Sequence, residues 1–381
     1  MTQGDKTWVG RAEAVAQDVL ARHAEDVDRQ ARWPAEGLAA LGESGLLGLT
    51  VPASFGGGGQ GPGTFAAVIG TLAEHCASTA MIYLMHVCGT QTIAEAMAFP
   101  QREAVLRAAA AGRHLSTLAF SEKGSRSHFW APVSQAVAEG DTHRLSAEKS
   151  FVTSAGHADS YVVSARSAGT TDPMVSTLYY VPRDTPGLTT SGPWNGLGLR
   201  GNASAPMRLE KVAVPTRHRL SGEGEGFALM MSVLPWFQLG SAAVSVGIAR
   251  AATAGTRQHL LGTRLEHLAQ PLAALPNLRA RLARMQITVD AQQAFLGHVA
   301  RQMETPGPTT LLAVLEGKAA AAEAALDVTD LAMRACGGAA FGRQLTVERN
   351  FRDARAAAVM APTTDVLYDF VGKALLGMPL F

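Results

Sequence analysis

The sequence predicts a mostly α-helical α+β fold in three consecutive parts, because the spacing of its hydrophobic residues changes twice along the chain. Residues 1–112 have mainly helical spacing, residues 113–220 consist of short β-rich runs separated by prolines and glycines, and residues 221–381 are helical again. We therefore expect an N-terminal α-helical domain, a middle antiparallel β domain and a C-terminal helical bundle with these boundaries.

The N-terminal part begins with a helix predicted over residues 7–31, where hydrophobic residues return on one face at helical spacing. Pro34 starts a second, shorter helix. The glycines of segment 46–63 are also common in phosphate-binding loops, but no Lys-Ser/Thr pair follows them, so we expect a connecting turn. Helical spacing resumes at residue 65 and continues to the end of this part.

The middle part shows no helical spacing and contains two segments rich in small hydroxyl residues. Residues 161–163 and 175–181 are rich in β-formers, and Gly140-Asp141 indicates a turn. The two segments are SEKGSRSH (121–128) and EKSFVTSAGHAD (148–159). Hydroxyl side chains beside glycines allow a backbone to approach a flat or phosphorylated ligand.

The C-terminal part is predicted to pack as a bundle of long helices. Hydrophobic residues over 278–303 follow alternating spacings of four and three, and the short break at 306–308 predicts an antiparallel neighbour that ends at Gly337-Gly338. Residues 227–249 carry no charge, a length that could span a bilayer. Glycine, proline, glutamine and serine dilute this stretch, so we expect a buried core helix and no membrane span.

Composition excludes several classes of protein. Hydrophobic residues make up 47% of the chain and charged residues 17%, which is typical of a globular protein. The 33 basic and 32 acidic residues nearly balance, so there is no electrostatic case for nucleic-acid binding. Three cysteines lie at no metal-ligand spacing and predict neither a metal site nor a disulfide framework. The first residues lack a signal-peptide pattern, and we expect a cytoplasmic protein.

Four segments resemble the acyl-CoA dehydrogenase family. SEKGSRSH is similar to the family signature TEPxAGSD, and EKSFVTS follows it at about the distance of the family's GxKxWITN. Residues 194–215 resemble WxKLGxRxSxTxxxxFxxVxVP, and residues 336–377 resemble the C-terminal motif that contains GG, ER, RD and EGT. The resemblance spans most of the chain and implies an acyl-CoA dehydrogenase-like fold with a C-terminal four-helix bundle, and an FAD-dependent oxidoreductase.

The resemblance also implies which residues would hold FAD. Ser121 takes the position that bonds the pyrimidine edge of the flavin, Ser127 the position that meets the phosphates, and Thr153 the position near flavin N5. Phe151 takes the place of the tryptophan beside the ring, and Thr363 is a further retained flavin contact. Three positions of the first motif depart from the family pattern: Lys123, Arg126 and His128.

A second group of implied FAD contacts would come from a neighbouring subunit. In relatives the GG turn, here Gly337 and Gly338, reaches the FAD of another subunit, which implies a homo-oligomer, either a dimer or a tetramer. Arg264 and Arg334 stand near family positions that contact the pyrophosphate and adenosine side. Arg334 replaces a glutamine and TRLEHL (263–268) replaces RxQFG, so these two contacts depart from the pattern.

The catalytic glutamate of the family is absent. It opens the EGT motif, which here reads Ala361-Pro362-Thr363, and alanine cannot accept a proton. A subset of the family places its base where Phe237 and Gln238 stand, and neither is a base. The nearest carboxylates in sequence are Asp365 and Asp369, about one and two helical turns further on.

Three functions follow from this pattern. The first is dehydrogenation of an acyl-CoA or a carrier-protein-bound acyl thioester with a non-standard or missing base, and with electron-transfer flavoprotein or oxygen as electron acceptor. The second is a flavin-dependent monooxygenase of the same fold, for which the glutamate is not required. The third is a non-catalytic FAD-binding partner protein. Retention of the flavin-contacting hydroxyl residues favours catalysis over the third.

Overall fold

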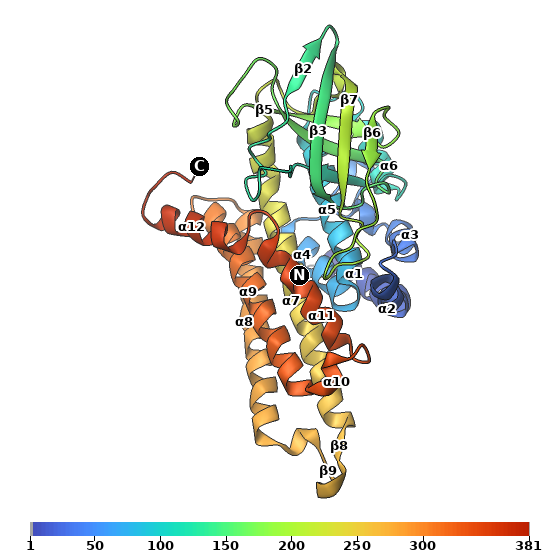
Figure 1. Ribbon diagram of the computed structural model, residues 1–381, viewed down its shortest axis with the longest axis vertical. Helices are drawn as coiled ribbons and strands as arrows, with labels where there is room; N and C mark the ends of the chain where they lie inside the picture. The colour runs from blue at the N-terminus through green and yellow to red at the C-terminus, as the bar shows by residue number, and fades with distance from the viewer. Residues whose placement is uncertain (1–2, 381) are drawn as a thin grey trace.

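The computed structural model describes residues 3–380 and confirms the mostly helical α+β fold in three parts (Figure 1). The N-terminal part is helical up to the first strand. Its helices are α1 (Gln3–Val15), the π-helical turn η1 (Ala16–Leu20), α2 (Ala21–Gln30), α3 (Ala35–Glu43), α4 (Pro62–His75), α5 (Ala77–Glu95) and α6 (Arg102–Ala110). The glycine-rich segment 46–63 forms short 3-10 turns between α3 and α4, as expected for a connection.

The β domain consists of two sheets, one with the order β1-β4-β5 and one with the order β2-β3-β7-β6. The strands are β1 (Ser116–Ala119), β2 (Ala136–Glu139), β3 (Thr142–Val152), β4 (Ser160–Arg166), β5 (Ser176–Pro182), β6 (Leu188–Thr190) and β7 (Ala205–Pro215). One detail differs from the expected antiparallel domain, because β1 and β4 pair in parallel. The β2-β3 hairpin lies between them in sequence and returns the chain to the same end of the sheet.

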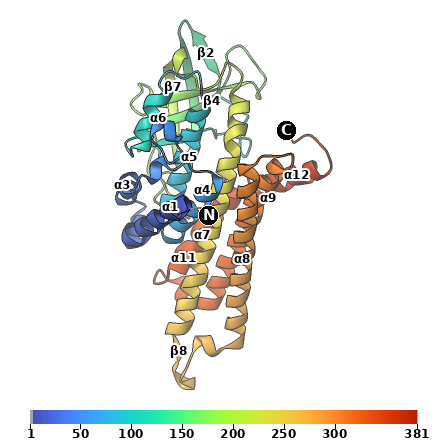
Figure 2. The same cartoon turned by 180° about the vertical axis from the view of Figure 1, so that it is seen from behind.

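The C-terminal bundle is formed by α7 (Gly226–Gly262), α8 (Pro276–Glu304), α9 (Thr310–Cys336) and α11 (Thr346–Val359), with α10 (Gly338–Phe341) and α12 (Thr364–Leu375) at its ends. Figures 1 and 2 show α7, α8 and α9 running side by side, with the β domain at one end. The structure also contains a hairpin that was not predicted, formed by the two-residue strands β8 (Arg264–Leu265) and β9 (Gln270–Pro271). It lies at the other end of the bundle. Its strands are too short to produce a recognisable β pattern.

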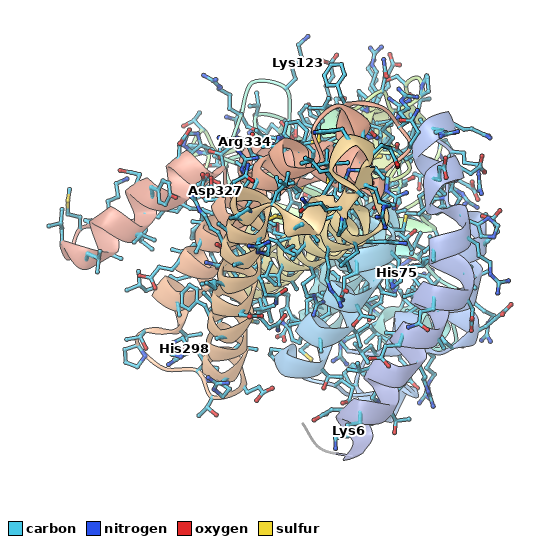
Figure 3. The ribbon with its side chains drawn as sticks, turned by 90° about the horizontal axis from the view of Figure 1, so that it is seen from below. Lys6, His75, Lys123, His298, Asp327 and Arg334 are labelled. Carbon is cyan, nitrogen blue, oxygen red and sulfur yellow. The ribbon has the colours of Figure 1, made fainter. Side chains whose placement is uncertain are left out.

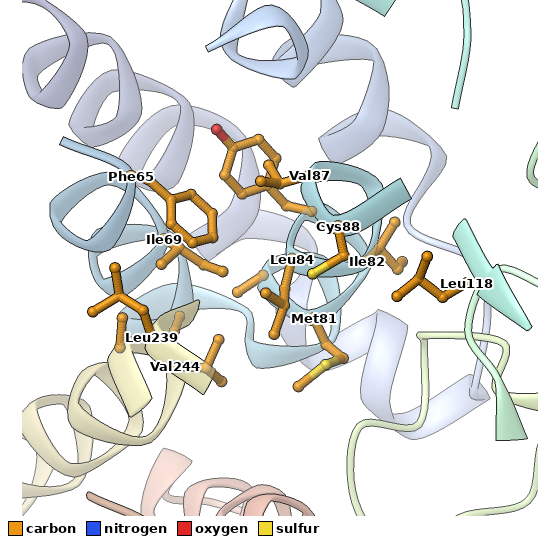
Figure 4. Close-up of a cluster of buried hydrophobic side chains, with 14 of the residues drawn as sticks. Phe65, Ile69, Met81, Ile82, Leu84, Val87, Cys88, Leu118, Leu239 and Val244 are labelled. Atoms are coloured by element: carbon orange, nitrogen blue, oxygen red, sulfur yellow. The ribbon is translucent and has the colours of Figure 1, made fainter. Parts of the chain in front are cut away.

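Helix α7 is the axis of the molecule. Its 37 residues extend for about 55 Å and contact α4, α5, α9 and α11. Leu239 and Val244 pack with Phe65 and Leu84 in the buried cluster of Figure 4, and a Cβ on Gly240 would lie 2.3 Å from Leu84 Cδ1. Within residues 3–380, α7 alone is long and apolar enough to cross a membrane, but this stretch forms the centre of the fold.

Two adjacent residues of α11 connect the three parts of the chain. The Arg352 guanidinium donates to the Asp28 carboxylate at 2.8 Å, and Arg200 Nε donates to the Asp28 carbonyl oxygen at 2.8 Å. Asp353 Oδ1 accepts a hydrogen bond from the Leu199 backbone at 2.7 Å. The Arg-Asp pair that the sequence singled out by resemblance therefore joins the N-terminal helices, the loop before β7 and the bundle.

Candidate active site

The bundle and the β domain meet at the turn formed by residues 360–363. The Thr363 N–H donates to Ser127 Oγ at 3.0 Å, so the first and the last of the motifs are joined although 236 residues separate them. The hydroxyl of Thr364, the first residue of α12, is buried without a hydrogen-bond partner among the described residues. Ala361 lies within this turn and is partly buried against the core.

Lys318, on α9, holds this turn from the other side. Its Nζ donates to the carbonyl oxygens of Met360 at 2.9 Å and Pro362 at 2.6 Å, the two residues that flank Ala361. Burial lowers the pKa of Lys318 to about 7. The Phe237 ring centroid lies 5.7 Å from the same Nζ, so Lys318 lies next to both positions that the resemblance implies for the family's base.

Sequence reasoning missed Lys318. The available signal was a single lysine on the otherwise small and apolar face of an alanine-rich helix. A lysine in such a position needs carbonyl or carboxylate partners inside the fold.

A buried ion pair fixes the first flavin motif to strand β3, and it was also missed. Lys149 Nζ lies 2.6 Å from Glu122 Oε1 and donates to the Ser164 carbonyl oxygen. Glu122 Oε2 accepts hydrogen bonds from the backbone of Val133 at 2.8 Å and Ser134 at 2.7 Å. Burial opposes the charged form of Glu122, but the Lys149 ammonium outweighs it, so the pKa of Glu122 stays below its usual value. Burial lowers the pKa of Lys149.

The remaining β-domain residues present hydroxyl groups and one exposed ring. Thr153 Oγ1 lies 2.9 Å from Ser204 Oγ, and the Ser121 carbonyl oxygen accepts from the Ser150 N–H at 2.8 Å. Phe151 is 70% exposed, with a left-handed backbone (φ 55°) where the register of β3 and β7 shifts. Such a bulge turns a side chain outwards. An exposed aromatic ring beside buried hydroxyl groups fits a flat, polar-edged ligand such as the flavin ring.

The implied contacts Arg264, Arg334, Gly337 and Gly338 lie at the other end of the bundle. All four are exposed. Figure 3 looks along the molecule from this end and labels Arg334. Gly337 follows Lys318 by 19 residues, which is about 28 Å along α9. One subunit therefore does not bring these residues to Ser127 and Thr363, the other group for which the resemblance implies FAD contacts.

Asp365 and Asp369 lie on the outer face of α12, whereas Ala361 packs against the core. The Asp369 carboxylate pairs with Lys373 at 2.9 Å. Both aspartates border a cavity of about 390 Å³, and they face away from the side of α12 that is buried. The other residues lining the cavity are His128, Trp130, Met174, Val366, Phe370, Lys373 and Leu380. The structure thus places neither carboxylate beside Ala361.

Comparison with known proteins decides the family. The N-terminal, middle and C-terminal domain models of acyl-CoA dehydrogenase match residues 2–113, 117–212 and 224–376, which is nearly the whole chain. The chain belongs to the acyl-CoA dehydrogenase family. Its relatives by sequence are acyl-CoA dehydrogenases, so this family member is an FAD-dependent oxidoreductase.

Individual relatives are distant but cover the full length. A probable acyl-CoA dehydrogenase of Bacillus subtilis, YngJ, is 28% identical over 371 residues, with 95% of each chain covered. The structure of butyryl-CoA dehydrogenase from Megasphaera elsdenii superposes with a TM-score of 0.92 at 23% identity and covers 99% of each chain. The prolyl acyl carrier protein oxidase AnaB superposes with a TM-score of 0.89 at 22% identity, covering 98% of this chain and 99% of that one. These two structures show the shared fold.

Proposed function

We propose that this acyl-CoA dehydrogenase family member removes hydrogen from the α and β carbons of an acyl thioester, with a non-standard or missing base. The observation that carries the proposal is the hydrogen bond from Thr363 to Ser127. It joins the two flavin motifs at the turn that contains Ala361. A chain that had lost flavin chemistry would have no need to keep this junction.

FAD would be held by Ser121, Ser127, Phe151, Thr153 and Thr363, and when bound it would accept hydride from the β carbon. The half-buried hydroxyl groups of Ser121, Ser127 and Thr363 and the exposed Phe151 ring fit this cofactor. Lys318 fixes the turn, because two of its N–H groups bind the carbonyl oxygens on either side of Ala361. Removal of the α proton lacks a positioned carboxylate, so we expect slow dehydrogenation of simple acyl groups.

The thioester would be an acyl-CoA or an acyl group on a carrier protein, and the electron acceptor would be electron-transfer flavoprotein or oxygen. Relatives by sequence carry acyl-CoA dehydrogenase names, which supports CoA. The similar fold of an oxidase that is named for a carrier-protein substrate supports the carrier protein.

A flavin-dependent monooxygenase is the second candidate, and Ala361 is the observation that favours it. Oxygen chemistry at the flavin does not require the missing glutamate. A non-catalytic FAD-binding partner is the third candidate. The retained hydroxyl groups of Ser121, Ser127 and Thr153 count against it.

We further propose a homo-oligomer, either a dimer or a tetramer, in which Gly337, Gly338, Arg264 and Arg334 approach the FAD of a neighbouring subunit. The exposure of all four supports this arrangement. Phe341, the last residue of the short helix α10 that begins at Gly338, is 87% exposed and would be covered by the neighbour.

An anaerobic titration tests the proposed function. Purified protein loaded with FAD is mixed with a panel of acyl-CoAs, and the flavin absorbance is followed. Bleaching by one of the thioesters supports the dehydrogenase. Bleaching only by reduced pyridine nucleotide or a flavin reductase supports the monooxygenase, and no bleaching by any of these supports the non-catalytic partner.

A further inference from the structure

Gln238 and Ser241 on α7 are buried polar side chains that the fold leaves unpaired. Both are fully buried. The amide nitrogen and oxygen of Gln238 have no hydrogen-bond partner among residues 3–380, and the Ser241 hydroxyl has none there either. Buried polar groups in native proteins are nearly always paired, so two unpaired side chains within one helical turn are a specific feature that needs an explanation.

The helix itself does not satisfy these groups, although it does so for a neighbour. Ser245, one turn further along the same side, donates its hydroxyl to the Ser241 carbonyl oxygen at 3.0 Å. The Ser241 hydroxyl makes no equivalent bond. Ser241 therefore remains available to another molecule, and Ser245 does not.

The two side chains lie on one flank of α7 beside Phe237, and Ser241 is the nearer of the two. At 3.6 residues per turn, Ser241 lies roughly 40° and Gln238 roughly 100° around the helix from Phe237. The Phe237 ring lies 5.7 Å from Lys318 Nζ, which binds the turn containing Ala361. The unpaired groups are thus on the side of α7 that approaches the proposed reaction centre.

The side of α7 opposite Gln238 and Ser241 is already filled. Leu239 lies roughly 160° around the helix from Ser241 and packs with α5 in the cluster of Figure 4, where Leu84 is fully buried. A Cβ on Gly240 would lie within 2.3 Å of Leu84, which leaves no room on that side. An acyl group that enters beside Phe237 would meet Gln238 and Ser241 instead.

We propose that the Gln238 amide and the Ser241 hydroxyl bind a polar substituent of the acyl group. The substrate class is then an acyl thioester that carries a hydroxyl or amino group, in place of a plain hydrocarbon chain. The amide offers a donor and an acceptor and the hydroxyl offers both, which suits either substituent. A plain acyl chain would leave all three atoms unpaired, and a site built to hydrogen-bond a substrate rejects the analogue that lacks the group. This inference rests on the proposed function and narrows its substrate class.

Matched thioesters test the inference. Flavin reduction is measured anaerobically with butyryl-CoA, 3-hydroxybutyryl-CoA, 4-hydroxybutyryl-CoA and 4-aminobutyryl-CoA, in the wild type and in Gln238→Met, Ser241→Ala and Ser245→Ala. We expect the wild type to prefer at least one substituted thioester. Gln238→Met should reduce that preference, expressed as a ratio of kcat/KM values, by roughly 10-fold, which is the range of one or two hydrogen bonds. Ser241→Ala should reduce it by a smaller factor, and Ser245→Ala should leave it unchanged.

A stability measurement provides a readout besides activity. Without substrate, Gln238→Met should raise the thermal midpoint of the FAD-loaded protein by roughly 2 °C, because it removes an unpaired buried amide. Ser245→Ala, which removes a paired hydroxyl, should lower it. A lower midpoint for Gln238→Met would show that the amide is satisfied within the protein and would overturn the inference.

The outcomes separate the inference from the function on which it rests. If thioesters bleach the flavin but the preference ratio is the same in Gln238→Met and wild type, only the inference fails. The inference alone also fails if the wild-type protein prefers butyryl-CoA over every substituted thioester. If no thioester bleaches the wild-type flavin, the proposed function fails and the inference fails with it.

Discussion

At the scale of single residues, the site combines Ala361, at the position where the resemblance implies a glutamate, with the buried side chain of Lys318. Lys318 binds the carbonyl oxygens on both sides of Ala361. A buried ammonium is costly, and here it is offset by the two carbonyl hydrogen bonds and the Phe237 ring, because no ion pair to Lys318 forms among residues 3–380. Lys318 therefore acts as a positioning residue for the turn that carries Thr363.

Replacing Lys318 should weaken FAD binding. In Lys318→Met the turn loses both donors, and Thr363 is no longer held against Ser127. We expect the Kd for FAD to rise roughly 10-fold, corresponding to about 1.4 kcal/mol, with partial recovery in Lys318→Arg. Calorimetric titration of the apoprotein with FAD measures this, and Lys6→Met, an exposed lysine on α1, is the matched control. An unchanged Kd in Lys318→Met would show that the turn holds without the lysine.

Restoring the carboxylate should raise the rate of flavin reduction. Proton abstraction by a positioned base typically contributes about 10²- to 10⁴-fold. Ala361→Glu, combined with Pro362→Gly to give the turn backbone freedom, should raise the rate of flavin reduction towards this range. The Lys318 ammonium nearby would favour the ionised form of the new carboxylate. Stopped-flow bleaching with the best thioester of the panel measures the gain.

Two controls complete this test. Asp365→Asn and Asp369→Asn should keep the wild-type rate, because both carboxylates lie on the outer face of α12. A large loss of rate in either variant would identify that aspartate as the base, although its side chain lies on the outer face of α12. No response to any thioester, before or after Ala361→Glu, would favour the monooxygenase.

At the scale of secondary-structure elements, the segment 121–128 is fixed by an ion pair between its Glu122 and Lys149 of strand β3. The Glu122–Lys149 pair is buried, whereas the Glu139–Arg144 pair of the β2-β3 hairpin is exposed. Removing one partner of a buried pair leaves an uncompensated charge, and such changes cost about 3–5 kcal/mol. Exposed pairs contribute about 0–1 kcal/mol.

Lys149→Met should therefore destabilise the protein far more than Arg144→Met. We expect a loss of about 3 kcal/mol in the free energy of unfolding for the first and below about 1 kcal/mol for the second. Urea unfolding of the FAD-loaded protein measures both. Equal effects would show that the buried pair is not what fixes the loop.

The link between α11 and the loop before β7 should make stability depend on pH. Burial raises the pKa of Asp353 from 3.8 to about 6, so the folded state favours the protonated carboxyl. The stability gained from that proton is full below pH 3.8 and is lost as the pH rises through about 6, a difference of about 3 kcal/mol. Asp353→Asn keeps an oxygen for the Leu199 N–H, and its unfolding free energy should fall less between pH 4 and 7 than that of the wild type. Asp184→Asn, on an exposed turn, should follow the wild type.

At the scale of the whole molecule, hydrophobic spacing was enough to predict the three parts, because helices and strands differ in period. Spacing could not reveal the parallel pairing of β1 and β4, since direction depends on where the intervening hairpin returns the chain. Family resemblance identified Ser127 and Thr363, which the structure brings together. Neither approach found Lys318 or the Glu122–Lys149 pair, because their roles arise from partners distant in sequence.

The two groups of implied FAD contacts can act on one cofactor only if subunits associate. Ser127 and Thr363 lie at one end of the bundle, whereas Gly337 and Phe341 lie at the other end, about 28 Å along α9. Gly337 has a left-handed backbone (φ 59°) that suits glycine, and the Phe341 ring is 87% exposed. A closed assembly would cover this end with the flavin seat of a neighbour.

Disrupting this end should therefore lower both the mass of the assembly and its FAD content. We expect Phe341→Asp to shift the protein towards the monomer and to reduce the ratio of FAD to protein, because an exposed aromatic ring that becomes buried in an interface contributes strongly to association. Light scattering after gel filtration gives the mass, and absorbance gives the FAD content. Met97→Asp, at a 77% exposed position in the N-terminal domain, is the control and should change neither. A wild type that is monomeric with one FAD per chain would contradict the arrangement, since one subunit would then hold the cofactor without Gly337 and Gly338 of another.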